Sequence, residues 1–250
     1  MLFENRIKEI DELKKQIDKH RPLKKEQVEK LKEYYRIGLT YSSNALEGNS
    51  LTETETKVVI EDGITIGGKP IKDHYEAMGH SEAFDLLYGL AKTNKITEKN
   101  ILELHRLFYY RIDAQSAGKY RKVKVLISGT EFTPPFPLQV PALMKKFAAQ
   151  IALKRRKLHP VEFAAWLHKE LVTIHPFKDG NGRTARLLMN LALLQSGYCI
   201  TVIPPVVRAE YINVLKKAQV PPQSDQPFIN FISCMVAEAM NDFLRLLTAI

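Results

Sequence analysis

The sequence predicts an all-α protein with one short β-hairpin, and three observations favour this fold class. Apolar residues recur at three- and four-residue steps through most of the chain, as Ile7, Ile10 and Leu13 do near its start, and this spacing lines one face of a helix. Glycines and prolines separate the periodic stretches, as expected between helices. Residues 120–133 alone alternate apolar with other side chains, which is the period of a strand.

The periodic stretches predict ten helices. Residues 50–53 resemble an N-terminal cap for the third helix, because they follow the helix-breaking pair Gly48-Asn49. The stretch 63–70 has the composition of a loop. The predicted helical ranges are 4–19, 24–46, 53–61, 73–92, 97–110, 138–156, 160–174, 183–196, 208–217 and 227–248.

The exception to the helical pattern lies at 120–133. Val123, Val125 and Ile127 alternate with other residues and precede the pair Ser128-Gly129, which favours a turn. Prolines follow from position 134 onward. We therefore expect a short β-hairpin or flap in this segment.

Composition limits the class of protein. A chain of 250 residues that is 45% hydrophobic and 26% charged is typical of a soluble globular protein with one sizeable core. The first fifteen residues lack the apolar region of a secretory leader, and no stretch approaches the ~20 apolar residues that cross a bilayer. Cys199 and Cys234 lie among apolar residues without metal-ligand spacing, which indicates reduced thiols. We expect a cytoplasmic protein with no membrane partner.

The net charge of +9 permits an anionic partner without naming one. The densest basic cluster, residues 154–157, suits a solvated face between two helices, and an acidic protein target is the alternative. No aromatic-interleaved nucleic-acid motif is present, so nucleic acid is not an expected partner.

The most informative stretch is HPFKDGNGRTAR, at residues 175–186. Pro176 disfavours the helical conformation for His175, so the preceding helix should end there. Gly180 and Gly182 are free to adopt positive φ, and such a turn can direct backbone N–H groups into a concavity at the start of the next helix. This arrangement predicts a nest that binds an anion such as phosphate.

The side chains around this nest suit chemistry at phosphorus. Arg183 and Arg186 are three residues apart, so both should project from one face of the first helical turn. Asp179 is a hard oxygen ligand suited to Mg²⁺, and His175 has a pKa suited to accepting a proton near neutral pH. A plain helix–turn–helix corner with solvated arginines is the alternative. A Walker-type phosphate loop and a zinc-type H-E-x-x-H motif are absent from the sequence.

The twelve residues match the signature HPFx[DE]GNGRxxR at every specified position, and the chain resembles the Fic (Fido) family over most of its length. The resemblance implies a helical Fic catalytic core at 96–232, preceded by an N-terminal helical region at 1–95 and followed by a C-terminal helix end at 233–250, all in one compact unit. It also implies transfer of AMP from ATP to a Ser, Thr or Tyr hydroxyl of a target protein.

The resemblance assigns a role to each residue of the loop. His175 would be the general base, and Asp179 would hold Mg²⁺ between the α- and β-phosphates. Arg183 would contact the distal phosphates, and Arg186 would hold the γ-phosphate. The anion hole would consist of the amides of Gly180, Asn181 and Gly182, with the Asn181 side chain helping to fix the α-phosphate.

A second match lies upstream. Residues 43–48, SNALEG, resemble the family's inhibitory motif [ST]xxxE[GN], with Ser43 and Glu47 at its key positions. These two residues are four apart at a predicted helix end, so both can point at one partner. The resemblance names Arg186 as that partner, in a bidentate pair that would make ATP bind unproductively. An exposed Glu in an ordinary capping turn is the alternative.

Two further assignments follow from the resemblance. Residues 120–133 correspond to the family's flap, in which Val123, Val125 and Ile127 would pair with the target backbone by strand addition, although the same side chains would suit a core strand. Tyr211 lies in a segment that resembles the one whose tyrosine stacks near adenine, although an aromatic on a helix is often a core residue.

Three functions remain as hypotheses. The first is an AMP transferase restrained by Glu47, and the second is a phosphodiesterase that uses the same site, with Glu47 orienting a water, to remove AMP from modified proteins. The third is a non-enzymatic nucleotide-sensing module. The resemblance also raises a homodimer, and a CDP-choline donor is a rarer family variant. The target protein is not written in the sequence.

Overall fold

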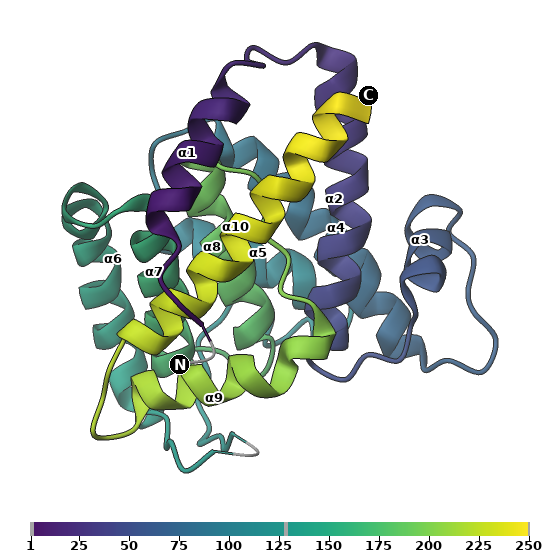
Figure 1. The fold of residues 1–250 in the computed structure, drawn as a ribbon. Helices are drawn as coiled ribbons and strands as arrows, with labels where there is room; N and C mark the ends of the chain where they lie inside the picture. Colours follow the sequence, from purple (N-terminus) through teal and green to yellow (C-terminus); the bar gives the residue numbers. More distant parts are fainter. Residues whose placement is uncertain (1–2, 128–129, 250) are drawn as a thin grey trace.

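The computed structural model describes residues 3–127 and 130–249, and their regular structure is helical (Figure 1). All ten predicted helices are present, and the largest boundary difference is the first helix, which begins at residue 7 instead of 4. Their bounds are α1 Ile7–Asp18, α2 Lys25–Ala45, α3 Glu53–Glu61, α4 Ile71–Ala91, α5 Glu98–Tyr109, α6 Val140–Lys157, α7 Pro160–Ile174, α8 Asn181–Gln195, α9 Arg208–Gln219 and α10 Gln226–Ala249. Short 3₁₀ turns at Pro137–Gln139 and Pro205–Val207 lead into α6 and α9.

The centre of the molecule is the pair α7 and α8, which the loop 175–180 joins. Both helices are apolar on several faces, and Leu167, Leu171, Leu187 and Leu191 are fully buried. Burial of each such side chain contributes about 1.5–3 kcal/mol. Helices α4, α5, α6 and α10 pack around the pair, and α1 lies along α10 (Figure 1). The loop between α7 and α8 is therefore held on both sides by the most buried part of the core.

Helix α2 brings the upstream motif to the central pair. It packs against α4 and reaches α8 with its C-terminal end. The short helix α3 follows and packs on α2 and α4 through a separate small cluster of Leu51, Val59 and Ala77. Its cap is shifted by two residues from the expected position. Thr52 accepts from the Glu55 amide at 3.2 Å, and Glu55 accepts from the Thr52 amide at 2.7 Å.

The predicted β-hairpin is not confirmed. None of the described residues in 120–127 and 130–133 forms a strand, and the predicted turn at Ser128-Gly129 lies outside the described residues. Here Arg121 organises the backbone in place of strand pairing. Its guanidinium donates to the carbonyls of Val123, Pro135 and His175 at 3.1, 2.6 and 2.7 Å. Residues 120–127 therefore form an irregular strap tied to the end of α7.

None of the described helices combines the length and the apolar character of a membrane span.

The approach of α4 to α5 depends on Gly79. A Cβ at this position would lie 2.5 Å from the Phe108 carbonyl oxygen and 3.0 Å from that of Leu107, so the two helices would have to separate. We expect Gly79→Ala to lower the free energy of unfolding by about 1–3 kcal/mol, measured by urea denaturation. Gly89→Ala is the matched control on the same helix, because no atom lies within 4 Å of its Cβ, and it should stabilise by about 0.5–1 kcal/mol. Equal effects of the two substitutions would contradict the close approach.

Candidate active site

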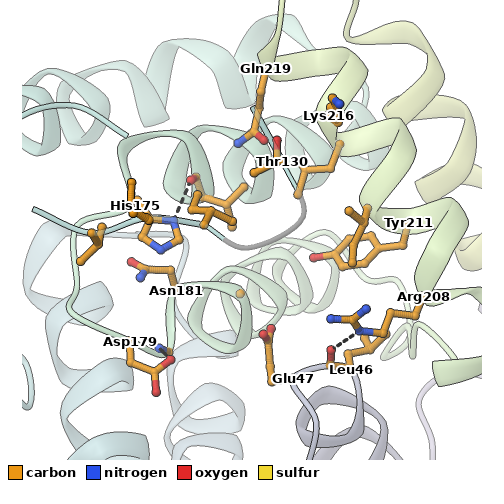
Figure 2. A pocket seen from close by; sticks show the side chains of 18 of the residues that line it. Leu46, Glu47, Thr130, His175, Asp179, Asn181, Arg208, Tyr211, Lys216 and Gln219 are labelled. Carbon is orange, nitrogen blue, oxygen red and sulfur yellow. Dashed lines mark hydrogen bonds between the residues drawn. The ribbon is translucent and has the colours of Figure 1, made fainter. Parts of the chain in front are cut away.

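The end of α7 places His175. The residue adopts a left-handed conformation with φ 51° and ψ 58°, which ends the helix as Pro176 predicts. Its Nδ1 lies 3.2 Å from the carbonyl oxygen of Val172, and a carbonyl can only accept, so Nδ1 carries the proton in the neutral ring. Nε2 is then the nitrogen with a free lone pair, and Figure 2 shows the ring beside Asn181 at the wall of the pocket.

The protonation state of His175 follows from its surroundings. Burial lowers the pKa of the imidazole below its usual 6.5, and the hydrogen bond to Val172 opposes this shift without cancelling it. His175 is therefore neutral at pH 7, with Nε2 able to accept a proton. His175 thus has the tautomer and the charge state that a general base needs.

The loop after His175 is fixed from inside. Asn181 accepts from the Phe177 amide at 2.9 Å and donates to the Phe177 carbonyl at 3.0 Å. The Phe177 ring is buried and stacks on His105, with ring centres 3.7 Å apart. The Asn181 side chain thus holds the loop, and its predicted contact with an α-phosphate stays a prediction.

The two glycines serve different purposes. Gly180 has φ +79°, as expected for the turn, and precedes the first residue of α8. Gly182 does not use the positive φ that is open to a glycine. Its missing side chain instead admits Glu47, because a Cβ there would lie 2.2 Å from Glu47 Oε1. The amides of the first turn of α8 have no intrahelical acceptor, and a helix start of this kind favours an anion.

Arg186 is the buried centre of the site, with only 2% of its side chain exposed. Its Nε donates to Ser43 Oγ at 3.0 Å, and its Nη2 donates to the Ser43 carbonyl at 2.7 Å. Nη2 also donates to Glu47 Oε1 at 2.8 Å, so Arg186 contacts both Ser43 and Glu47, and an inhibitory role for these contacts stays a prediction. The pair with Glu47 uses this one hydrogen bond and is not bidentate, because the other donors face Ser43 and Tyr211.

Glu47 differs from its partner in exposure. Its side chain keeps 36% of its area accessible, and its carboxylate points into the pocket (Figure 2). Burial would raise the pKa of this carboxyl, but Arg186 and then Arg183 outweigh burial and lower the pKa below 4.5. Glu47 is therefore ionised at neutral pH. Its negative charge lies in the position that an anion bound at the N-terminus of α8 would take.

Glu47, His175 and residues 180–182 line one pocket of about 430 Å³, a volume suited to a small-molecule ligand. Glu47 and the helix start form one side, and His175 forms another. Val125 and Ile127 of the strap also line the pocket, whereas Val123 does not and is 54% exposed.

Comparisons with known proteins agree with this geometry. A model of the Fic/DOC family matches residues 95–193. The protein adenylyltransferase Fic of Drosophila grimshawi is 37% identical over 207 residues, which cover 82% of this chain and 42% of that protein. A Fic domain containing signaling protein from Bacteroides thetaiotaomicron has a crystal structure that aligns over 96% of this chain and 97% of its own, with a TM-score of 0.88 and 31% identity. The chain belongs to the Fic/DOC family.

A fragment of Fic-1 from C. elegans is also similar, with a TM-score of 0.86 and 28% identity over 97% of this chain and 72% of that one. The all-α Fic fold that the motif implied is thereby confirmed. The chain spans about two fifths of the length of the curated Drosophila relatives that it matches.

In this Fic protein Asp179 is the predicted metal ligand. Its Oδ1 accepts from the Gly180 amide at 2.6 Å and lies 3.3 Å from Arg183, while its Oδ2 is 4.0 Å from Lys72. The side chain is 44% exposed and lines the pocket. Within the described residues no three acidic, His or Cys side chains gather around a metal position. A lone carboxylate fits Mg²⁺, which takes one or two carboxylates together with phosphate and water oxygens.

Arg183 does not share a direction with Arg186, which corrects the prediction that both project from one face. Its side chain is 3% exposed and turns toward α4, where Nη1 lies 2.6 Å from Glu76 Oε1. Its guanidinium also stacks on the ring of Phe108 at 4.3 Å. Sequence reasoning missed Glu76. The available signal was the helical spacing of the polar residues Asp73, Glu76 and His80, which the structure buries together on α4.

Tyr211 has a contact that the sequence did not predict. It lines the pocket but is only 5% exposed, and its hydroxyl lies 3.3 Å from Arg186 Nη1 and 2.8 Å from His168 Nε2. His168 is fully buried, and burial lowers its pKa to about 3, so the ring beside Tyr211 is neutral. Tyr211 thus helps to orient Arg186. Stacking of its ring on adenine stays a prediction.

The Tyr211 hydroxyl can be tested by its removal. Tyr211→Phe leaves buried Arg186 Nη1 and His168 Nε2 without this partner, so the free energy of unfolding should fall by about 1–3 kcal/mol. Chemical denaturation followed by circular dichroism measures the change. Tyr110→Phe is the control, because Tyr110 is 37% exposed and should change stability by less than about 0.5 kcal/mol. A neutral Tyr211→Phe would show that the hydroxyl does not support Arg186.

Proposed function

We propose that the chain is a protein adenylyltransferase that moves AMP from ATP to a Ser, Thr or Tyr hydroxyl of a target protein, under restraint by Glu47. One observation carries the proposal. A neutral histidine with a free Nε2 lies in the same pocket as the start of α8, and the buried Arg186 is hydrogen-bonded to Glu47, which lines that pocket. The names of the Drosophila relatives support the same activity.

The base chemistry follows from the tautomer of His175. Nε2 accepts the proton of the target hydroxyl as that oxygen attacks the α-phosphorus. The bond from the α-phosphorus to the bridging oxygen breaks, and pyrophosphate leaves with the bonding electrons. The imidazolium that forms keeps its Nδ1–H···O hydrogen bond to Val172, which stabilises the positive charge.

The rest of the loop supplies charge and position. The first-turn amides of α8 would receive phosphate oxygens, and Arg186 would bind the γ-phosphate once Glu47 leaves it. Asp179 Oδ2 would hold Mg²⁺, which shields phosphate charge when it is bound. Most of the catalysis in such a site comes from this positioning and electrostatic stabilisation.

Glu47 is the restraint in this proposal. Its carboxylate occupies the space between Gly182 and Arg186, and its negative charge opposes a phosphate there. The exposed strap at 120–127, with Val125 and Ile127 facing the pocket, is the docking surface for an extended target segment. A cytoplasmic location and a homodimer belong to the same proposal, and the buried thiol of Cys199 suits the former.

Removal of AMP is a second candidate function, and the position of Glu47 favours it. Its ionised carboxylate is accessible within the pocket and could orient a water toward a phosphodiester. Wild type would then release AMP from a modified protein, and Glu47→Gly would not. Release by both proteins at equal rates would remove Glu47 from this role.

The transferase is tested by labelling. With Mg-ATP labelled at the α-phosphate, Glu47→Gly should incorporate AMP into itself or lysate proteins at least about tenfold faster than wild type, since loss of about 1.4 kcal/mol of restraint is a tenfold change. Adding His175→Ala should abolish the signal, whereas His159→Ala, a histidine that pairs with Asp11 away from the pocket, should not. If Glu47→Gly incorporates no labelled AMP, the proposal is wrong.

The base is tested by the pH profile of Glu47→Gly at saturating Mg-ATP. Because the pKa of His175 is lowered, the active neutral ring persists down to pH 6.5, and the rate should fall only below that value. Glu47 raises the pKa of His175 through its charge, so its removal extends the plateau to still lower pH. A rate that declines as the pH drops from 8 to 7 would argue against His175 as the base.

A further inference from the structure

A buried ion pair lies beside the start of α8. Arg183, in the first turn of α8, and Glu76, on α4, are 3% and 5% exposed, and their charged atoms lie 2.6 Å apart. Breaking such a pair leaves an uncompensated buried charge, so the two groups hold each other in place. The face of Phe108 at 4.3 Å further restrains the guanidinium.

Glu76 is itself held on both oxygens. Oε1 faces Arg183, and Oε2 accepts from Asn49 Nδ2 at 2.9 Å. Asn49 also donates to the carbonyl of Asp73, so it connects the loop after α2 to α4. Lys72 Nζ lies 3.6 Å from Glu76 Oε1. The carboxylate has little freedom to turn, and the Arg183 that it holds has little freedom either.

The free side of Arg183 points toward the pocket wall. Its Nη2 lies 3.3 Å from Oδ1 of Asp179, which lines the pocket. Nε and Nη1 are buried, and Nη1 faces Glu76, so Nη2 is the nitrogen of Arg183 on the side of the site. Glu76 therefore binds the Nη1 side of Arg183, and the Nη2 side faces the site.

We propose that Glu76 is a positioning residue for nucleotide binding, which holds Arg183 in the orientation that contacts the distal phosphates of ATP. A buried carboxylate near an anion-binding helix start opposes anion binding by its charge alone. Here Arg183 neutralises that charge. Glu76 also orders the long Arg183 side chain before the nucleotide binds, which lowers the entropic cost of binding. The inference rests on the proposed function, because it takes ATP as the ligand.

A comparison of ATP with AMP separates positioning from general damage to the fold. In the Glu47→Gly background, Glu76→Gln should raise the Kd of Mg-ATP by about tenfold or more, measured by titration calorimetry, because it removes the charge that holds Arg183. The Kd of AMP, which lacks distal phosphates, should change by less than about twofold. The control is Glu82→Gln, also on α4, whose partner Arg111 lies outside the pocket, and it should change neither value.

A second variant covers the case in which Glu76→Gln does not fold. Asn49→Ala removes the hydrogen bond to Oε2 and should weaken Mg-ATP about threefold with AMP unaffected. Equal weakening of ATP and AMP, or no change in either, overturns the role of Glu76 while the Glu47→Gly parent still transfers AMP. A Glu47→Gly parent that binds no Mg-ATP overturns both this inference and the proposed function.

Discussion

The site depends on the burial of one guanidinium. Arg186 lies in the core with 2% of its side chain exposed, where an unpaired charge would cost several kcal/mol. Ser43 meets two of its nitrogens with neutral acceptors that fix its direction, and Tyr211 approaches a third. Among the described residues, Glu47 alone supplies the opposite charge. Because Glu47 is also the accessible partner, in the proposed function a phosphate would replace it charge for charge while the neutral contacts keep Arg186 in place.

The sequence could predict the helices because their signals are local. Three- and four-residue spacing of apolar groups marks each helix, and Pro176 marks the end of α7 through a steric clash with its neighbour. The pairing of Ser43 and Glu47 with Arg186 was also predictable, but only through the family resemblance. The residues lie more than 130 positions apart in sequence, and no local pattern connects them.

The remaining features depend on tertiary contacts that leave little local trace. Glu76 faces Arg183 only because α4 packs against α8, and a charged residue on a helix is by default expected in solvent. Tyr211 is likewise drawn to Arg186 by the packing of α9. Apolar residues do alternate at 120–127, but a strand also needs a pairing partner. Here the Arg121 guanidinium bonds the carbonyls of Val123 and His175 instead, which ties the segment to the end of α7.

The anchoring of the loop after α2 limits how Glu47 can leave Arg186. On one side Leu46 accepts from Arg208 Nε at 2.7 Å, and on the other Ser50 binds Asp73 through both its amide and its hydroxyl, at 2.8 and 2.6 Å. Moving the backbone would break these bonds and also pull Asn49 from α4. Rotation of the Glu47 side chain breaks one hydrogen bond and one ion pair, both of which the proposed phosphate would restore on Arg186. Release by rotation is therefore the cheaper path, and it leaves the Asn49 contacts on α4 intact.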